Sequence, residues 1–179
     1  QVAKGKADAD ELKRVFTHPD KVFPAHAYRM RFTNNHDFNS WQGSDTELYG
    51  PAFKTMAVLA ATLPGMPLIY SGQEAVLDKR LAFFEKDQID WKNYPLEGFY
   101  TNLLKLKKDN KALWNGQYGG TLEFLDTGND KVIAYRRKLD ANTVTVTANV
   151  SGKAQHYATG GAKARKTMAA WTWKIDTKK

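Results

Sequence analysis

Residues 31–37 read RFTNNHD, and residues 63–74 read LPGMPLIYSGQE. The first stretch continues a β-prone alternation that starts at residue 28, and the second contains a Pro-Gly break followed by a short apolar strand at residues 68–70. Between them, residues 51–63 predict a buried helix, because they are rich in alanine and methionine and begin with proline. Two strands joined by a helix favour parallel pairing, so the carboxyl ends of the two strands are expected to lie together.

The remaining elements of the N-terminal part follow from periodicity and capping signals. A helix is predicted over residues 8–17, with Asp8 and Glu11 at the spacing of a capping box. Residues 34–50 are polar and predict a long loop, of the kind that often carries function. A later helix is predicted over residues 96–108. Its buried face would consist of Phe99, Leu103, Leu104 and Leu106. A group of lysines is predicted to form its solvated face: Lys105, Lys107, Lys108 and Lys111.

The pattern changes after residue 115. Four strand-like segments separated by turn signals follow, at residues 121–126, 131–138, 143–150 and 167–176. The residues between the last two segments, 153–166, predict a loose connection. Such a run favours an antiparallel sheet with its own core. The predicted fold class is therefore α/β followed by all-β, with one domain over residues 1–115 and a second over residues 116–179.

Composition and charge exclude several classes of protein. The 179 residues include no cysteine, which excludes disulfides and thiolate metal sites. No apolar run is long enough to span a membrane. The net charge of +8 could suit nucleic acid, but the lysines are mostly scattered, so nucleic-acid binding is not favoured. Composition does not decide the location of the protein; we favour a secreted or periplasmic location over a cytoplasmic one.

His36 and Asp37 are the candidate chemical groups, because they follow a predicted strand directly and sites of parallel α/β folds lie at strand carboxyl ends. A carboxylate beside an imidazole can stabilise a developing positive charge and bind hydroxyl groups. Taken alone, such a pair is more often a loop histidine beside an aspartate that caps a turn. Nearby Trp41 can stack on a sugar or simply pack against its neighbours.

The surrounding blocks add a family context. Residues 31–37 resemble the fourth conserved region of the α-amylase family (glycoside hydrolase family 13), in which an aromatic residue and two variable residues precede Asn-His-Asp. Residues 63–74 resemble the eighth-strand segment of that family. Residues 83–91 and 99–116 are similar to the stretch before its last barrel helix and to that helix. The resemblance implies the end of a (β/α)8 barrel followed by the small antiparallel β-sandwich called domain C.

The resemblance also implies roles for individual residues. Asp37 would be the third catalytic carboxylate, which holds the sugar and stabilises the oxocarbenium-like transition state. His36 would hydrogen-bond the same sugar and Asn35 would support the loop. Gln73 and Glu74 would organise the next strand end. The expected ligand is an α-glucan or maltooligosaccharide, with Trp41 stacking on a neighbouring sugar. No cofactor or metal ligand is visible in the sequence; calcium is possible in the intact enzyme, with ligands upstream.

One departure from the family pattern limits the expected activity. Retaining glycosidases need a nucleophile and an acid/base carboxylate about 5–5.5 Å apart. In this family both lie upstream of Asn-His-Asp, and the residues before residue 31 contain no match. The prediction is a C-terminal fragment of an α-glucan-active glycosidase or transglycosidase, inactive alone and completed by a companion chain or a swapped copy. The alternative is a non-catalytic carbohydrate-binding or interaction module.

Overall fold

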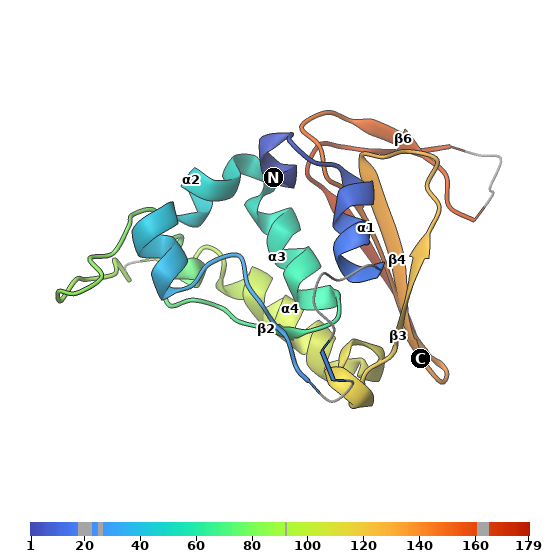
Figure 1. The fold of residues 1–179 in the computed structure, drawn as a ribbon, viewed down its shortest axis with the longest axis horizontal. Helices are drawn as coiled ribbons and strands as arrows, with labels where there is room; N and C mark the ends of the chain where they lie inside the picture. The colour runs from blue at the N-terminus through green and yellow to red at the C-terminus, as the bar shows by residue number, and fades with distance from the viewer. Residues whose placement is uncertain (18–22, 25–26, 92, 161–164) are drawn as a thin grey trace.

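The computed structural model describes residues 1–17, 23–24, 27–91, 93–160 and 165–179. Helices α1, α3 and α4 pack beside a four-stranded antiparallel sheet, and the segment after residue 76 extends away from both (Figure 1). One apolar cluster joins these helices to strands β4 and β5. No described helix has the length and apolar character needed to cross a bilayer.

Helix α1 (Ala9–Thr17) starts where the sequence predicts. Asp8 Oδ1 accepts hydrogen bonds from the backbone N–H groups of Asp10 and Glu11, both at 3.0 Å. The Glu11 carboxylate binds the Arg14 guanidinium on the outer face of the helix. The N–H of Ala9 donates to Asp130 O at 2.8 Å, which ties α1 to the turn before β4. The predicted helix and its Asp8 cap are confirmed, whereas the Glu11 carboxylate of the predicted capping box binds Arg14.

A short parallel pair forms between β1 (Met30–Arg31) and β2 (Met66–Pro67). The predicted parallel direction is confirmed, but the regular strands are shorter than predicted. The second strand ends before Leu68–Tyr70, the segment that the sequence favoured. The N–H of Leu68 still donates to Arg31 O at 2.8 Å, whereas the N–H of Tyr70 donates to the Gln73 side chain and leaves the ladder. Side-chain hydrogen bonding therefore ends this strand early.

The predicted long loop at residues 34–50 is largely helical. It contains the π-helical turn η2 (Phe38–Gln42) and the helix α2 (Asp45–Tyr49). The Ser44 side chain accepts from the N–H of Glu47 while the Glu47 carboxylate accepts from the N–H of Ser44, which forms a complete capping box. The loop prediction is wrong because polar residues that cap short helices are also typical of loops. Short 3-10 turns occur elsewhere: η1 (Val2–Lys4), η3 (Gly50–Ala52), η4 (Gln73–Ala75), η5 (Lys111–Leu113) and η6 (Gly116–Tyr118).

The two longer helices confirm the predicted elements and correct the faces. Helix α3 (Phe53–Thr62) is buried over most of its length, as predicted. Helix α4 (Glu97–Asp109) buries Leu103, but Leu104 is 46% exposed. Lys107, predicted to be solvated, is instead buried. Lys107 is buried because two segments outside the helix supply hydrogen-bond partners for its ammonium group.

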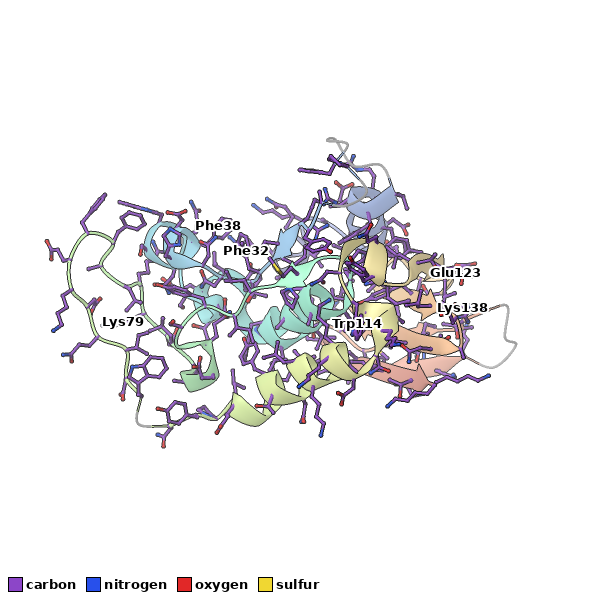
Figure 2. All side chains as sticks on the ribbon, turned by 90° about the horizontal axis from the view of Figure 1, so that it is seen from below. Phe32, Phe38, Lys79, Trp114, Glu123 and Lys138 are labelled. Carbon is purple, nitrogen blue, oxygen red and sulfur yellow. The ribbon has the colours of Figure 1, made fainter. Side chains whose placement is uncertain are left out.

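Lys107 and Arg137 form a buried cationic junction between the helices and the sheet. The Lys107 ammonium donates to Gly65 O and to Leu113 O. The Arg137 guanidinium donates to Thr62 O at 3.2 Å and also reaches the carbonyls of Gly120 and Trp114. Burial, together with the charge of Arg137, lowers the pKa of Lys107 to about 8. Trp114 lies at this junction in Figure 2.

The antiparallel part follows the predicted order with one interruption. The larger sheet has the order β3-β4-β5-β8, formed by β3 (Thr121–Leu125), β4 (Val132–Leu139), β5 (Asn142–Asn149) and β8 (Trp173–Lys178). A separate pair joins β6 (Gln155–Tyr157) to β7 (Lys166–Met168). The predicted single strand at 167–176 is wrong, because Trp171 adopts a left-handed φ of 53° and divides it. Trp171 and Trp173 both pack against the apolar core. The predicted loose connection contains β6.

Candidate functional site

The candidate site is the chain segment that leaves β1. Thr33 and Asn34 are buried beneath it, and the chain then turns outward. The Asn35 side-chain oxygen accepts from the N–H of Phe38 at 2.8 Å, and its backbone oxygen accepts from the N–H of Asn39 at 2.8 Å. Asn35 therefore closes the first helical turn after the strand. This local capping agrees with the supporting role that the resemblance implied for it.

His36 and Asp37 lie on the outer surface of this turn. The His36 side chain is 71% exposed and that of Asp37 is 57% exposed, with 3.7 Å between His36 Nε2 and Asp37 Oδ1. Such an exposed pair contributes little to stability, because water screens it. Both side chains remain accessible to a ligand. The sequence therefore correctly predicted that they follow a strand of a parallel pair, at its carboxyl end.

Trp41 belongs to an exposed aromatic cluster, here defined as Trp41, Phe83 and Phe84. The ring centroids of Trp41 and Phe83 are 5.3 Å apart, and those of Phe83 and Phe84 are 4.7 Å apart. The His36 ring stacks on Phe83 at 6.0 Å. Phe84 is 85% exposed and Trp41 57%. The cluster brings three flat apolar faces beside the imidazole. Sequence reasoning did not predict this contact, because about 40 residues separate its two halves.

A buried polar network lies beneath the exposed residues and joins the two strand ends. Gln73 Nε2 donates to Thr33 Oγ1 at 2.7 Å and to Asp45 Oδ2 at 2.5 Å. Gln73 Oε1 accepts from the N–H of Tyr70 at 2.7 Å. The Tyr49 hydroxyl donates to Thr33 O at 2.7 Å. Gln73 thus organises the end of the second strand, as expected, while the part played by Asp45 was missed.

A cavity of about 10 Å³ adjoins this network and is lined in part by Asn34, Asp45, Tyr70 and Gln73. It has room for about one water molecule. His36, Asp37 and Trp41 are not among its lining residues. The candidate site therefore has two layers, a small buried polar layer and an exposed layer that carries the imidazole, the carboxylate and the aromatic rings. Phe32 and Phe38 lie at this end of the molecule in Figure 2, as does Lys79 on the extended segment.

Comparisons with known proteins find relatives of this chain among α-glucan-active enzymes. The chain is 29% identical over 161 residues to an α-1,4-glucan:maltose-1-phosphate maltosyltransferase of Picrophilus torridus, a match that covers 84% of this chain and 24% of that protein. It is 30% identical over 132 residues to the α-amylase MalA of Haloarcula japonica, which covers 71% of this chain and 19% of that protein. The chain is related to the α-amylase family. No family model matches it.

The fold of this α-amylase-like chain is also found in a solved structure. The crystal structure of the maltogenic α-amylase AmyB from Thermotoga neapolitana matches it with a TM-score of 0.72 at 15% sequence identity, over 98% of this chain and 45% of that one. The α-amylase-like chain spans about a quarter or less of the length of the curated relatives named above. The activities of those longer proteins therefore enter only as proposals.

Metal ligation finds no support among the described residues of the α-amylase-like chain. In that part of the molecule, no three or more side chains of histidine, cysteine, aspartate or glutamate gather to hold an ion.

Proposed function

We propose that this chain is the glucan-contacting C-terminal part of a retaining α-glucan-active glycosidase or transglycosidase. The observation that carries the proposal is the position of the Asn35–Asp37 loop, which leaves the carboxyl end of a strand paired in parallel with β2. Catalytic groups of (β/α)8 enzymes occupy that end of the strands. Relatives named as an α-amylase and a maltosyltransferase support the same substrate class.

The proposal extends to the architecture. The β1–β2 pair and the helices around it would be the last part of a (β/α)8 barrel over residues 1–115. The antiparallel strands over residues 116–179 would correspond to the β-sandwich domain C. Coverage of nearly the whole chain by an α-amylase structure supports this division. A (β/α)8 barrel has eight parallel strands, of which the β1–β2 pair would supply two, and the other strands would belong to the rest of the enzyme.

Each exposed residue has a role in the proposed site. Asp37 would hold a glucose unit through its hydroxyls and stabilise the positive charge that develops at its anomeric carbon. His36 would donate a hydrogen bond to the same sugar, and Asn35 would hold the turn. Trp41 would stack on a neighbouring sugar, because its face is exposed and supported by Phe83. The nucleophile and the acid/base would lie on the rest of the enzyme.

Calorimetric titration with maltoheptaose tests the proposed site directly. The wild-type chain is expected to bind weakly, in the millimolar range that a partial site allows. Asp37→Asn and Trp41→Ala are each expected to weaken binding about tenfold or more, whereas Tyr118→Phe, exposed on the other part of the molecule, should match wild type. Unchanged affinity in both site variants would contradict the proposal.

An activity assay tests the proposed division of the catalytic carboxylates. The chain alone should release no reducing sugar from maltoheptaose, because two carboxylates flanking the bond are required. Hydrolysis at enzymatic rates that Asp37→Asn abolishes would show that the missing carboxylates are present in this chain.

The exposed aromatic cluster favours a second candidate, a non-catalytic carbohydrate-binding module. Stacking of sugars on Trp41 and Phe84 alone would suffice for binding. This candidate predicts that Phe84→Ala abolishes maltoheptaose binding while Asp37→Asn leaves it intact. The primary proposal instead predicts that Asp37→Asn weakens binding, so the same titration distinguishes the two candidates.

A further inference from the structure

Asp45 occupies an unusual place for a carboxylate. Its side chain lies at the start of α2 and is 9% exposed, between the chain leaving β1 and the turn after β2. Its Oδ2 accepts from Gln73 Nε2 at 2.5 Å and lies 3.5 Å from the Thr33 hydroxyl. Thr33 directly precedes the Asn34–Asp37 turn, and Gln73 belongs to η4. Asp45 is thus the acceptor through which the two strand ends are connected.

The second oxygen of this carboxyl group has no partner. Asp45 Oδ1 is buried without a hydrogen bond, and it faces the small cavity described above. Within the part of the chain that the structure describes, Asp45 makes no ion pair with lysine or arginine, and its donors are a neutral amide and a neutral hydroxyl. A buried, unpaired negative charge costs several kcal/mol, whereas a neutral carboxyl group avoids that cost.

We propose that Asp45 is a positioning residue that acts in its protonated form and, through Gln73 and Thr33, holds the Asn35–Asp37 loop in register with the following strand end. What the loop does with a sugar rests on the proposed function above. The tether itself is a property of the fold and can be measured without any ligand. Asp45 makes no described contact with His36 or Asp37, so it acts through the network.

The surroundings of Asp45 agree with a neutral carboxyl group. Desolvation raises its pKa, an effect that the polar side chains of Gln73, Asn34 and Thr33 around it only partly oppose. The titratable groups that face it are phenols: burial raises the pKa of Tyr49 to about 12 and moves that of Tyr100 in the same direction, so both stay neutral near pH 7. The carboxyl group of Glu74 is a further titratable group near the same Tyr100.

The matched variants are Asp45→Asn and Asp45→Ala, with Asp109→Asn as the control on an exposed aspartate of α4. Asparagine has the shape of a protonated aspartate and keeps the acceptor, whereas alanine removes it. Backbone amide exchange is read by NMR at Asn35, Phe38 and Asn39, whose N–H groups are bonded within the loop. Protection at these amides should fall about tenfold in Asp45→Ala and stay within about twofold of wild type in Asp45→Asn and in the control.

Equal loss in the alanine and asparagine variants, or no loss in either, would overturn the proposal. Should Asp45→Ala fail to fold, Thr33→Val takes its place, because it removes the hydroxyl shared by Gln73 and Asp45 at nearly constant volume. It is expected to lower the same protection factors about threefold or more, and unchanged protection would contradict the tether.

The pH dependence separates positioning from packing. The carboxyl ¹³C shift of Asp45 should titrate above its ordinary value of 3.8, and loop protection in wild type should fall as pH rises through that transition. In Asp45→Asn the protection should not depend on this transition. Titration at or below 3.8 would overturn the proposal. Failure of maltoheptaose to bind the wild-type chain would defeat the proposed function alone, since the exchange data need no sugar.

Discussion

Charged side chains are arranged in opposite ways in two regions of this molecule. At the helix–sheet junction, Lys107 and Arg137 are buried and bonded to backbone carbonyls. At the strand ends, His36 and Asp37 face water and interact loosely at 3.7 Å. The first arrangement connects segments far apart in sequence and stabilises the fold, whereas the second leaves its groups free for a ligand. Substitutions at the junction should therefore change stability, and substitutions at the strand ends should change binding.

The largest effect is expected at Arg137. Arg137→Met keeps most of the side-chain volume but removes the donors to the carbonyls of Thr62, Gly120 and Trp114. Buried carbonyls without donors should lower the free energy of unfolding by about 3–4 kcal/mol, measured by urea denaturation. The neighbouring Arg136 is the matched control, because it faces outward and pairs with Glu123 across the strand. Arg136→Met should cost about 0–1 kcal/mol; equal losses would refute a special role for the buried junction.

Lys107 should give the next effect, and it depends on pH. Its pKa is lowered from 10.5 to about 8 in the folded chain, so the unfolded chain binds more protons between these values. The free energy of unfolding should therefore rise as pH increases from about 8 towards 10.5, by about 2–3 kcal/mol from this group. Lys107→Met should lose that rise, while Lys108→Met, on the exposed side of α4, should keep it. Denaturation at pH 7.5 and 9.5 compares the three proteins.

The contrast between the two regions also shows which features the sequence could predict. Helices over residues 8–17 and 51–63 were predictable, because periodicity and caps are local signals. The position of His36 and Asp37 beyond the carboxyl end of a strand in a parallel pair was predictable, because the β-prone run before them is a local signal. Lys107 was not, since a lysine in a run of lysines shows no sign that Gly65 and Leu113 will supply carbonyl partners.

The buried layer of the candidate site shows the same limit. Asp45 and Gln73 are 28 positions apart, and nothing in either local sequence indicates that they meet. The helical structure within residues 34–50 was partly predictable, because Ser44 and Glu47 have capping-box spacing. The break at Trp171 was not, since a left-handed tryptophan is a conformation that tertiary packing imposes. Local signals thus predicted elements, and long-range polar contacts decided the details.

A smaller loss of stability is expected where a neutral hydrogen bond spans the junction. The Tyr135 hydroxyl and the Thr62 hydroxyl are 2.5 Å apart, and Thr62 also donates to Val58 O. Tyr135→Phe leaves the Thr62 oxygen without that partner and should lower the free energy of unfolding by about 1 kcal/mol. Tyr118→Phe, at a tyrosine that is 59% exposed, should change it by less than about 0.5 kcal/mol. A loss of the size expected for Arg137→Met would show that the neutral contact, and not the cation, holds the junction.

The smallest effect on stability is expected at Asp37, although its effect on binding should be large. Asp37→Asn removes one charge of an exposed pair, and water already screens that pair, so the free energy of unfolding should change by less than about 0.5 kcal/mol. The same substitution should weaken maltoheptaose binding about tenfold. A stability loss above 1 kcal/mol would mean that Asp37 supports the loop, and any loss of binding could then reflect a displaced loop instead of a missing contact. Denaturation and calorimetry on the same preparation therefore show whether Asp37 can be substituted with a loss of binding but without a loss of stability.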